Sequence, residues 1–136
     1  DGVNGEVYFE LPTLAYGHEV SGIHLEFKDG KVINAKAERG EEALLKMLET
    51  DPGARYLGEF AIGANFKITH GMLNTLFDEK IGGTIHMALG RAYKEKRGGG
   101  ENESAIHWDI VKDMRTPGSV LSIDDMVVLE EGRLLI

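Results

Sequence analysis

The chain has 136 residues, which suits one ordinary domain whose core needs no disulfide or structural metal in order to fold. Its 23 Asp and Glu against 15 Lys and Arg give a formal net charge of −8, which argues against nucleic acid or an anionic membrane surface as a partner. The absence of cysteine excludes thiolate metal sites, cysteine nucleophiles and disulfides, and we expect a cytoplasmic protein.

The first third of the chain predicts three strands and a helix. Residues 3–11 alternate between apolar and polar side chains, as a half-buried strand does. Residues 21–38 predict two strands joined at Asp29-Gly30, because Asp-Gly between alternating runs is a strong hairpin signal. Residues 39–50 then change to a helical period, with Leu44, Met47 and Leu48 on one face.

Residues 55–63 predict a further strand, but one side chain does not fit its pattern. Simple alternation puts Leu57, Glu59 and Ala61 on one face, so a carboxylate lies among apolar neighbours. An unpaired carboxylate is costly to bury. Glu59 therefore needs a cationic partner, an exposed face or a metal ion.

The remaining segments predict a second short helix and several strands. We expect a helix in 68–79 through Met72, Leu73, Leu76 and Phe77, and a buried strand in 84–89 with His86 at its middle. Residues 94–103 are charged and rich in glycine, so we expect a mobile loop, and 119–136 predict a hairpin turning at 131–132. Together these elements indicate an α+β fold, mainly antiparallel or mixed β-sheet with two short helices.

The run Ile106-His107-Trp108-Asp109-Ile110-Val111 is the first candidate for a metal site. In an extended strand His107 and Asp109 point to one face, whereas Ile106, Trp108 and Ile110 point to the other. An imidazole and a carboxylate two residues apart are half of a metal site, since both donate lone pairs near pH 7. A half-buried strand with a solvated polar face would show the same pattern.

Other side chains extend this pair to a possible constellation of metal ligands, and each has a simpler explanation. Glu6 is as easily a solvated strand residue, Glu59 can pair with Lys or Arg, and His86 can be a hydrogen-bonded core histidine. Three carboxylates and two imidazoles are ligands of a type that favours Zn, Co or Mn. Two divalent ions and a bridging hydroxide would leave such a site close to neutral.

Four sequence blocks resemble the thermophilic metallo-aminopeptidase family of the aminopeptidase T and aminopeptidase S type. The family's Gly-Glu-Val-Phe-like and Arg-x-Leu-Gly-Glu segments are matched by residues 5–8 and 55–59. A Thr-Leu-Phe-Asp-Glu run followed by His-x-Ala-Leu-Gly-x-Ala-Tyr is matched by residues 75–79 and 86–93, and Ile-His-x-Asp by 106–109. The blocks occur in the family's order over roughly residues 4 to 110.

This resemblance implies a metal-dependent aminopeptidase that releases N-terminal amino acids from peptides by water activated at two divalent metal ions. It implies the metal ligands Glu6, Glu59, His86, His107 and Asp109. It also implies that Tyr93 stands at the metals and takes part in catalysis.

The family's proteins are about three times this length and place a large domain before the metal-binding one. Residues 1–136 are therefore expected to be the metal-binding catalytic domain, a C-terminal fragment of a longer two-domain enzyme, and the intact enzyme is expected to be a homodimer. The segment between Tyr93 and His107 is short for the family, and Tyr8 stands where phenylalanine is common. The alternative is a catalytically inactive metal-binding or dimerisation module. An acidic sugar-binding domain ranks last, because stacking aromatic residues are missing.

Overall fold

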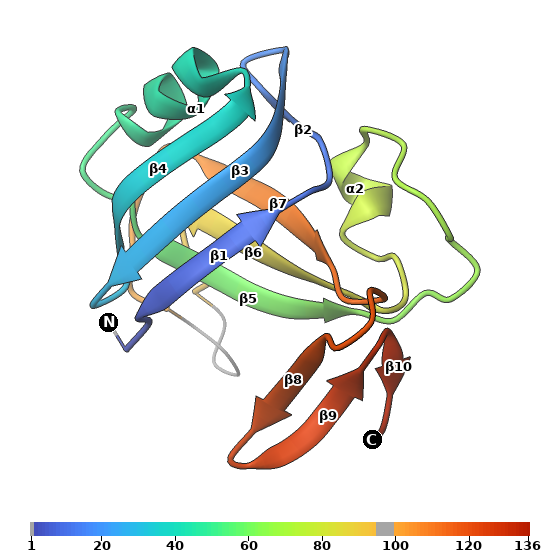
Figure 1. Ribbon diagram of the computed structural model, residues 1–136. Coiled ribbons are helices and arrows are strands. Elements are labelled where there is room, and N and C mark those ends of the chain that lie inside the picture. Colours follow the sequence, from blue (N-terminus) through green and yellow to red (C-terminus); the bar gives the residue numbers. More distant parts are fainter. Residues whose placement is uncertain (1, 95–99) are drawn as a thin grey trace.

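The computed structural model describes residues 2–94 and 100–136 (Figure 1). Its first layer is a four-stranded antiparallel sheet built around one long central strand, β3. On one edge β3 pairs with β4, and on the other it pairs in succession with β1 and β2. The strands are β1 (Gly5–Phe9), β2 (Thr13–Ala15), β3 (His18–Lys28) and β4 (Lys31–Arg39).

The predicted hairpin between β3 and β4 is confirmed, and its turn has the expected backbone. Asp29 and Gly30 have φ values of 50° and 82°, both in the left-handed region that a two-residue hairpin turn requires. The short strand β2 was not predicted from the sequence, because three residues carry too little alternation to be recognised. Pro12 stands between β1 and β2, where the chain leaves one strand and begins the next.

The second layer is a three-stranded antiparallel meander that follows the first sheet along the chain. It contains β5 (Leu57–Gly63), β6 (Thr84–Gly90) and β7 (His107–Asp113), with β6 at the centre. Helix α1 (Glu41–Leu48) connects the two layers and buries the predicted face of Leu44, Met47 and Leu48. Strand β6 therefore has a neighbouring strand on each side, and all seven of its residues are buried.

The two sheets pack face to face over one hydrophobic core. The first sheet contributes side chains such as Phe9, Ile23 and Leu25, and the meander contributes Leu89 and Ile110. Trp108 also lies in this core, where its indole Nε1–H donates to the carbonyl oxygen of Leu14 at 2.9 Å. The predicted alternation of the His107 strand is therefore confirmed, since Trp108 and Ile110 face the core and Asp109 faces the other side.

The C-terminal segment forms three strands rather than the predicted single hairpin. These are β8 (Val120–Ile123), β9 (Met126–Glu130) and β10 (Arg133–Leu134), a small sheet that lies below the two layers in Figure 1. The turn at Glu131–Gly132 is confirmed, whereas the turn at Asp124–Asp125 was missed. Both aspartates adopt positive φ, 49° and 65°. Asp tolerates positive φ better than most residues, but an Asp-Asp pair alone does not predict a turn.

The second predicted helix is much shorter than expected. Helix α2 (Thr75–Asp78) has four residues, and the preceding segment is irregular, so the prediction of a helix through Met72 and Leu73 is wrong. Leu73 has a φ of 55°, which no right-handed helix contains. The Asp78 carboxylate accepts the Met72 backbone N–H at 2.8 Å, so a turn closed by a side chain replaces the first helical turn.

The predicted fold class, α+β with mainly antiparallel sheet, is confirmed by these elements. The predicted mobile loop at 94–103 lies largely in residues 95–99, outside the described residues. Among the described residues, no helix has both the length and the apolar character that a membrane span requires.

We expect Ile110→Ala to lower the free energy of unfolding by about 2–5 kcal/mol, because the fully buried side chain leaves a cavity between the two sheets. Chemical denaturation followed by the fluorescence of Trp108, the single tryptophan, measures this loss. Val120→Ala is the control, since Val120 is 48% exposed and its truncation should change the free energy by less than about 0.5 kcal/mol. Equal effects of the two substitutions would contradict the assignment of the core.

Candidate metal centre

The candidate metal centre lies on the face of the meander that points away from the core. In the register of the sheet, Glu59 on β5 is opposite Ala88 on β6, and Ala88 is opposite Asp109 on β7. His86 lies two residues before Ala88 on the same face of β6, and His107 is opposite Gly90 at the other end of that strand. The donors therefore surround the methyl group of a fully buried alanine.

A β-bulge explains why Glu59 faces the donors although simple alternation places it with Leu57. The register shifts between Leu57 and Glu59, so that Gly58 is the extra residue and the two side chains point to opposite faces. Leu57 packs against the core, and Glu59 points outward. Gly58 is required here, because a Cβ atom at this position would lie 2.4 Å from the carbonyl oxygen of Gly90.

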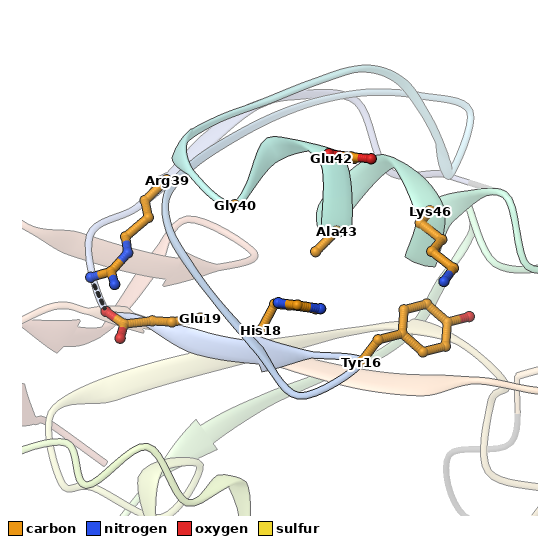
Figure 2. A pocket seen from close by; sticks show the side chains of 8 residues that line it. All are labelled: Tyr16, His18, Glu19, Arg39, Gly40, Glu42, Ala43 and Lys46. Atoms are coloured by element: carbon orange, nitrogen blue, oxygen red, sulfur yellow. Dashed lines mark hydrogen bonds and ion pairs between the residues drawn. The ribbon is translucent and has the colours of Figure 1, made fainter.

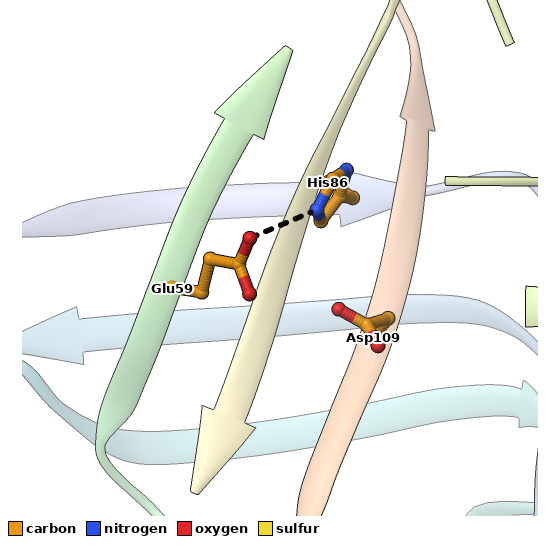
Figure 3. A group of neighbouring side chains, drawn as sticks. All are labelled: Glu59, His86 and Asp109. Carbon is orange, nitrogen blue, oxygen red and sulfur yellow. Dashed lines mark ion pairs between the residues drawn. The ribbon is translucent and has the colours of Figure 1, made fainter. Parts of the chain in front are cut away.

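The donor atoms converge from three adjacent strands, as Figure 3 shows for Glu59, His86 and Asp109. One ligand atom from each of these residues lies within 4.8 Å of the other two. Glu59 also divides its two oxygens between the histidines: Oε1 lies 3.4 Å from Nε2 of His86, and Oε2 lies 3.2 Å from Nε2 of His107. Nε2 of His107 lies 3.6 Å from Oδ1 of Asp109.

Backbone carbonyls determine which nitrogen of each imidazole carries the proton. Nδ1 of His86 lies 3.1 Å from the carbonyl oxygen of Glu79, and Nδ1 of His107 lies 2.6 Å from that of Arg91. A carbonyl only accepts, so both Nδ1 atoms are donors, and in the neutral rings both Nε2 atoms hold lone pairs. Each lone pair then faces an oxygen of Glu59, an arrangement that calls for a cation between them.

Asp109 gives a second indication that these donors suit a cation. Its Oδ1 is buried and, among the described residues, has no hydrogen-bond partner. Burial raises the pKa of the Asp109 carboxyl, which His107 and His86 oppose and the charges of Glu79 and Glu59 reinforce. A buried oxygen that is neither paired nor solvated is uncommon in folded proteins, and a bound cation satisfies it.

Tyr93 lies beside these donors without being buried. It follows β6, its side chain is 59% exposed, and its ring meets the His107 ring edge-on with centroids 5.2 Å apart. The negative charge of Glu59 raises the pKa of Tyr93, with further contributions from burial and from Asp109. The phenol therefore stays protonated at neutral pH and is available as a hydrogen-bond donor.

The structure does not bring Glu6 to the other predicted ligands. Its carboxylate lies 3.3 Å from Nε2 of His24 on the neighbouring strand β3, and its side chain is 64% exposed. Val7, the next residue of β1, packs against the core, so Glu6 points to the opposite face of the first sheet. The part of Glu6 in metal binding stays a prediction.

A cavity of about 470 Å³ opens beside the donors, and two of the charged residues that line it had no role assigned from the sequence. Glu79 and Lys80 line it together with Glu59, His86 and Tyr93. Their place follows from the irregular segment before β6, which returns over the sheet so that the Glu79 carbonyl meets His86. Sequence spacing does not predict that this segment returns over the sheet. The one available signal is that Glu79 belongs to the sequence block at residues 75–79.

A second cavity, of about 510 Å³, lies far from these donors, between the β2–β3 turn and α1 (Figure 2). Three of its charged side chains, Glu19, Arg39 and Lys46, have partners within the chain. Arg39 lies 3.2 Å from Glu19, and the ammonium of Lys46 stands 5.0 Å from the centre of the Tyr16 ring. This cavity contains no convergent set of unpaired donors among the described residues, and we assign it no chemistry.

Comparison with known proteins agrees with the chemistry of the site. The chain is 38% identical over 127 residues to aminopeptidase 2 from Geobacillus stearothermophilus, covering 82% of this chain and 30% of that protein. It is 39% identical over 123 residues to aminopeptidase T from Thermus thermophilus, covering 79% of this chain and 29% of that protein. The chain thus spans about 30% of the length of the curated relatives that it matches.

Solved structures show the same fold in longer chains. Wild-type AmpT from Thermus thermophilus superposes with a TM-score of 0.73 at 32% identity, over 98% of this chain and 36% of that one. A 2,5-dihydroxypyridine dioxygenase from Pseudomonas putida has a TM-score of 0.71 at 17% identity, over 97% of this chain and 40% of that one, and shares the fold alone. Because the model of the thermophilic metalloprotease family M29 also matches residues 1–133, this chain belongs to that family.

Proposed function

We propose that residues 1–136 are the metal-binding catalytic domain of a metallo-aminopeptidase and that the domain holds two divalent cations. The observation that carries the proposal is the division of the Glu59 carboxylate between the lone pairs of His86 and His107. Membership of a metalloprotease family and identity to named aminopeptidases support the same reading. The chain covers about 30% of its relatives, which supports a place within a longer enzyme, and we propose that it is the C-terminal part of a two-domain protein.

The donors fall into two groups that share one carboxylate, which favours two cations over one. Oε1 of Glu59 and Nε2 of His86 form the first group. Oε2 of Glu59, Nε2 of His107 and Oδ1 of Asp109 form the second. Oxygen and imidazole donors suit Zn, Co or Mn, and the unpaired Oδ1 of Asp109 is the atom that such an ion would satisfy.

When bound, a pair of divalent cations supplies a water molecule of lowered pKa and a Lewis acid for a carbonyl oxygen. The chain's own residues supply the remaining parts of a peptide hydrolysis. The carbonyls of Glu79 and Arg91 keep both imidazoles in the tautomer that a cation needs. The protonated Tyr93 phenol donates a hydrogen bond to the oxygen that becomes negative as the scissile carbonyl is attacked.

Glu79 is our candidate for the group that moves the proton. Glu79 lines the cavity with Glu59, His86 and Tyr93, and its carboxylate pairs there with Lys80. Glu79 accepts a proton from the attacking water and delivers it to the leaving nitrogen as the C–N bond breaks. The water oxygen thereby becomes part of the new carboxylate, and the leaving peptide regains a free amine.

The substrates that this chemistry fits are peptides with a free N-terminal amine, cut one residue at a time. For the intact enzyme we also propose a homodimer, as the family resemblance implies. We propose a cytoplasmic location, as expected from the absence of cysteine. An inactive metal-binding or dimerisation module is the alternative, because the chain covers only about 30% of its relatives.

Hydrolysis of leucine p-nitroanilide by the chain, with added Co or Zn and with a chelator, decides between these readings. We expect Glu59→Gln to lower metal content and turnover together, by about 100-fold or more in activity, because one carboxylate serves both donor groups. Elemental analysis measures the metal. Glu130→Gln makes the same chemical change at an exposed residue of β9 and should leave both quantities unchanged. Full metal content in Glu59→Gln would reject the site.

Asp109→Asn should stabilise the metal-free protein and abolish its stabilisation by metal. The buried carboxylate has a raised pKa, so its ionised form destabilises the fold at neutral pH, and a neutral amide removes that cost. The gain should vanish as the pH falls below the ordinary Asp value of about 3.9, where both states are protonated. Thermal unfolding with and without Zn measures both effects, with Asp125→Asn on the surface as control. A metal-free Asp109→Asn that is less stable than the wild type would contradict the argument.

Tyr93→Phe should reduce kcat by about 100-fold while the metal stays bound, because only the donor to the developing oxyanion is lost. Steady-state kinetics combined with elemental analysis separates catalysis from metal binding. Tyr8→Phe removes a hydroxyl from the first sheet, away from the site, and should leave kcat unchanged. Unaltered turnover in Tyr93→Phe would exclude its catalytic role.

A further inference from the structure

The cavity beside the metal centre has two acidic side chains and one basic side chain in its lining. Among the described residues that line it, Lys80 is the single permanent cation, and Glu59 and Glu79 are the carboxylates. Metal ions would neutralise the carboxylates that hold them, but nothing in the metal centre requires a lysine. The ammonium of Lys80 therefore stands in the cavity without a role in metal binding.

The Lys80 ammonium is held in place by two contacts and has one further N–H that can bind a ligand. Its Nζ donates to the carbonyl oxygen of Leu76 at 2.8 Å and forms an ion pair with Glu79. An ammonium has three protons, so one remains for a ligand. The side chain is 53% exposed, which leaves that proton accessible from the cavity. The fixed contact with helix α2 reduces the entropy that a flexible lysine loses when it binds.

The position of Lys80 along the chain places it close to where a scissile bond would lie. Glu79, its neighbour in sequence, accepts the Nδ1–H of His86 through its carbonyl oxygen at 3.1 Å. In a peptide, the carboxylate that follows the scissile bond is only one residue away, since consecutive Cα atoms are about 3.8 Å apart. A lysine side chain is longer than this step, and Lys80 lines the same cavity as Glu59 and His86, so its ammonium can reach a carboxylate bound there.

We propose that Lys80 determines substrate specificity by binding a carboxylate on the leaving side of the peptide. The inference rests on the proposed aminopeptidase function and adds a preferred substrate class to it. Two sources offer the same chemistry: the C-terminal carboxylate of a dipeptide, and an acidic side chain at the second residue of a longer peptide. A charge-assisted hydrogen bond from Lys80 would favour either one over its neutral amide analogue.

The two sources are separated by two pairs of substrates, each cut by the metal-loaded chain. The first pair is Leu-Gly and Leu-Gly amide, which differ only in the terminal carboxylate. The second is Leu-Glu amide and Leu-Gln amide, which differ only in the side chain. We expect the charged member of at least one pair to have a kcat/KM about tenfold higher, which corresponds to one charge-assisted hydrogen bond.

Variants at two lysines test whether Lys80 is the cause. Lys80→Met should bring the affected ratio close to one, and Lys80→Arg, which keeps the charge, should restore most of it. Lys67→Met is the matched control, because Lys67 is an exposed lysine of the segment before α2, and it should leave both ratios and the activity unchanged. Ratios that are equal in Lys80→Met and Lys67→Met would overturn the proposal.

A binding measurement separates this proposal from the proposed function. Leu-Gly is titrated into the metal-free, isotopically labelled chain, and NMR follows the backbone amides of Asn65 and Lys80, which line the cavity. We expect shifts with Leu-Gly that are lost with Leu-Gly amide and in Lys80→Met. Such shifts, combined with no hydrolysis by the metal-loaded chain, would support the Lys80 site and reject aminopeptidase activity in this domain. Hydrolysis with ratios that do not depend on Lys80 would support the function and reject the site.

Discussion

The metal centre depends on two backbone carbonyls, those of Glu79 and Arg91, which keep protons on the Nδ1 atoms of His86 and His107. With those protons fixed, two lone pairs and one carboxylate face each other across short distances, and repulsion between them falls only when a cation enters. Hydrogen bonds within the chain thus fix the orientation of both imidazoles. Such preorganisation lowers the cost of binding, because no imidazole has to change its tautomer or its orientation.

The same three strands separate stability from chemistry. Alternation along β7 sends Trp108 and Ile110 into the core and Asp109 to the outer face, so one strand serves both purposes without conflict. On β5 the alternation alone would fail, and the bulge at Gly58 corrects it for Glu59. The core therefore holds the ligands in place, while the ligands themselves add little to the packing that maintains the fold.

The sequence predicted the parts of this structure that depend on local pattern. The Asp29-Gly30 hairpin, the buried face of α1 and the alternation of β7 all follow from spacing within a few residues. The unusual position of Glu59 was visible, but the bulge that explains it depends on a close approach of Gly58 to the Gly90 carbonyl, which belongs to another strand. The extent of α2 was overestimated, because the side chain of Asp78 closes a turn that the apolar period concealed. Sequence spacing did not predict that Lys80 lines the cavity, because its position depends on the tertiary structure.

The small side chain of Ala88 leaves room for an ion between the candidate ligands. Its methyl group lies in register between Glu59 and Asp109, and no atom of the residue is exposed. A branched or longer residue at this position would occupy the volume reserved for an ion, although every ligand would still be present and the inner face would still be apolar. We therefore expect a bulkier side chain at position 88 to keep the sandwich and to weaken metal binding.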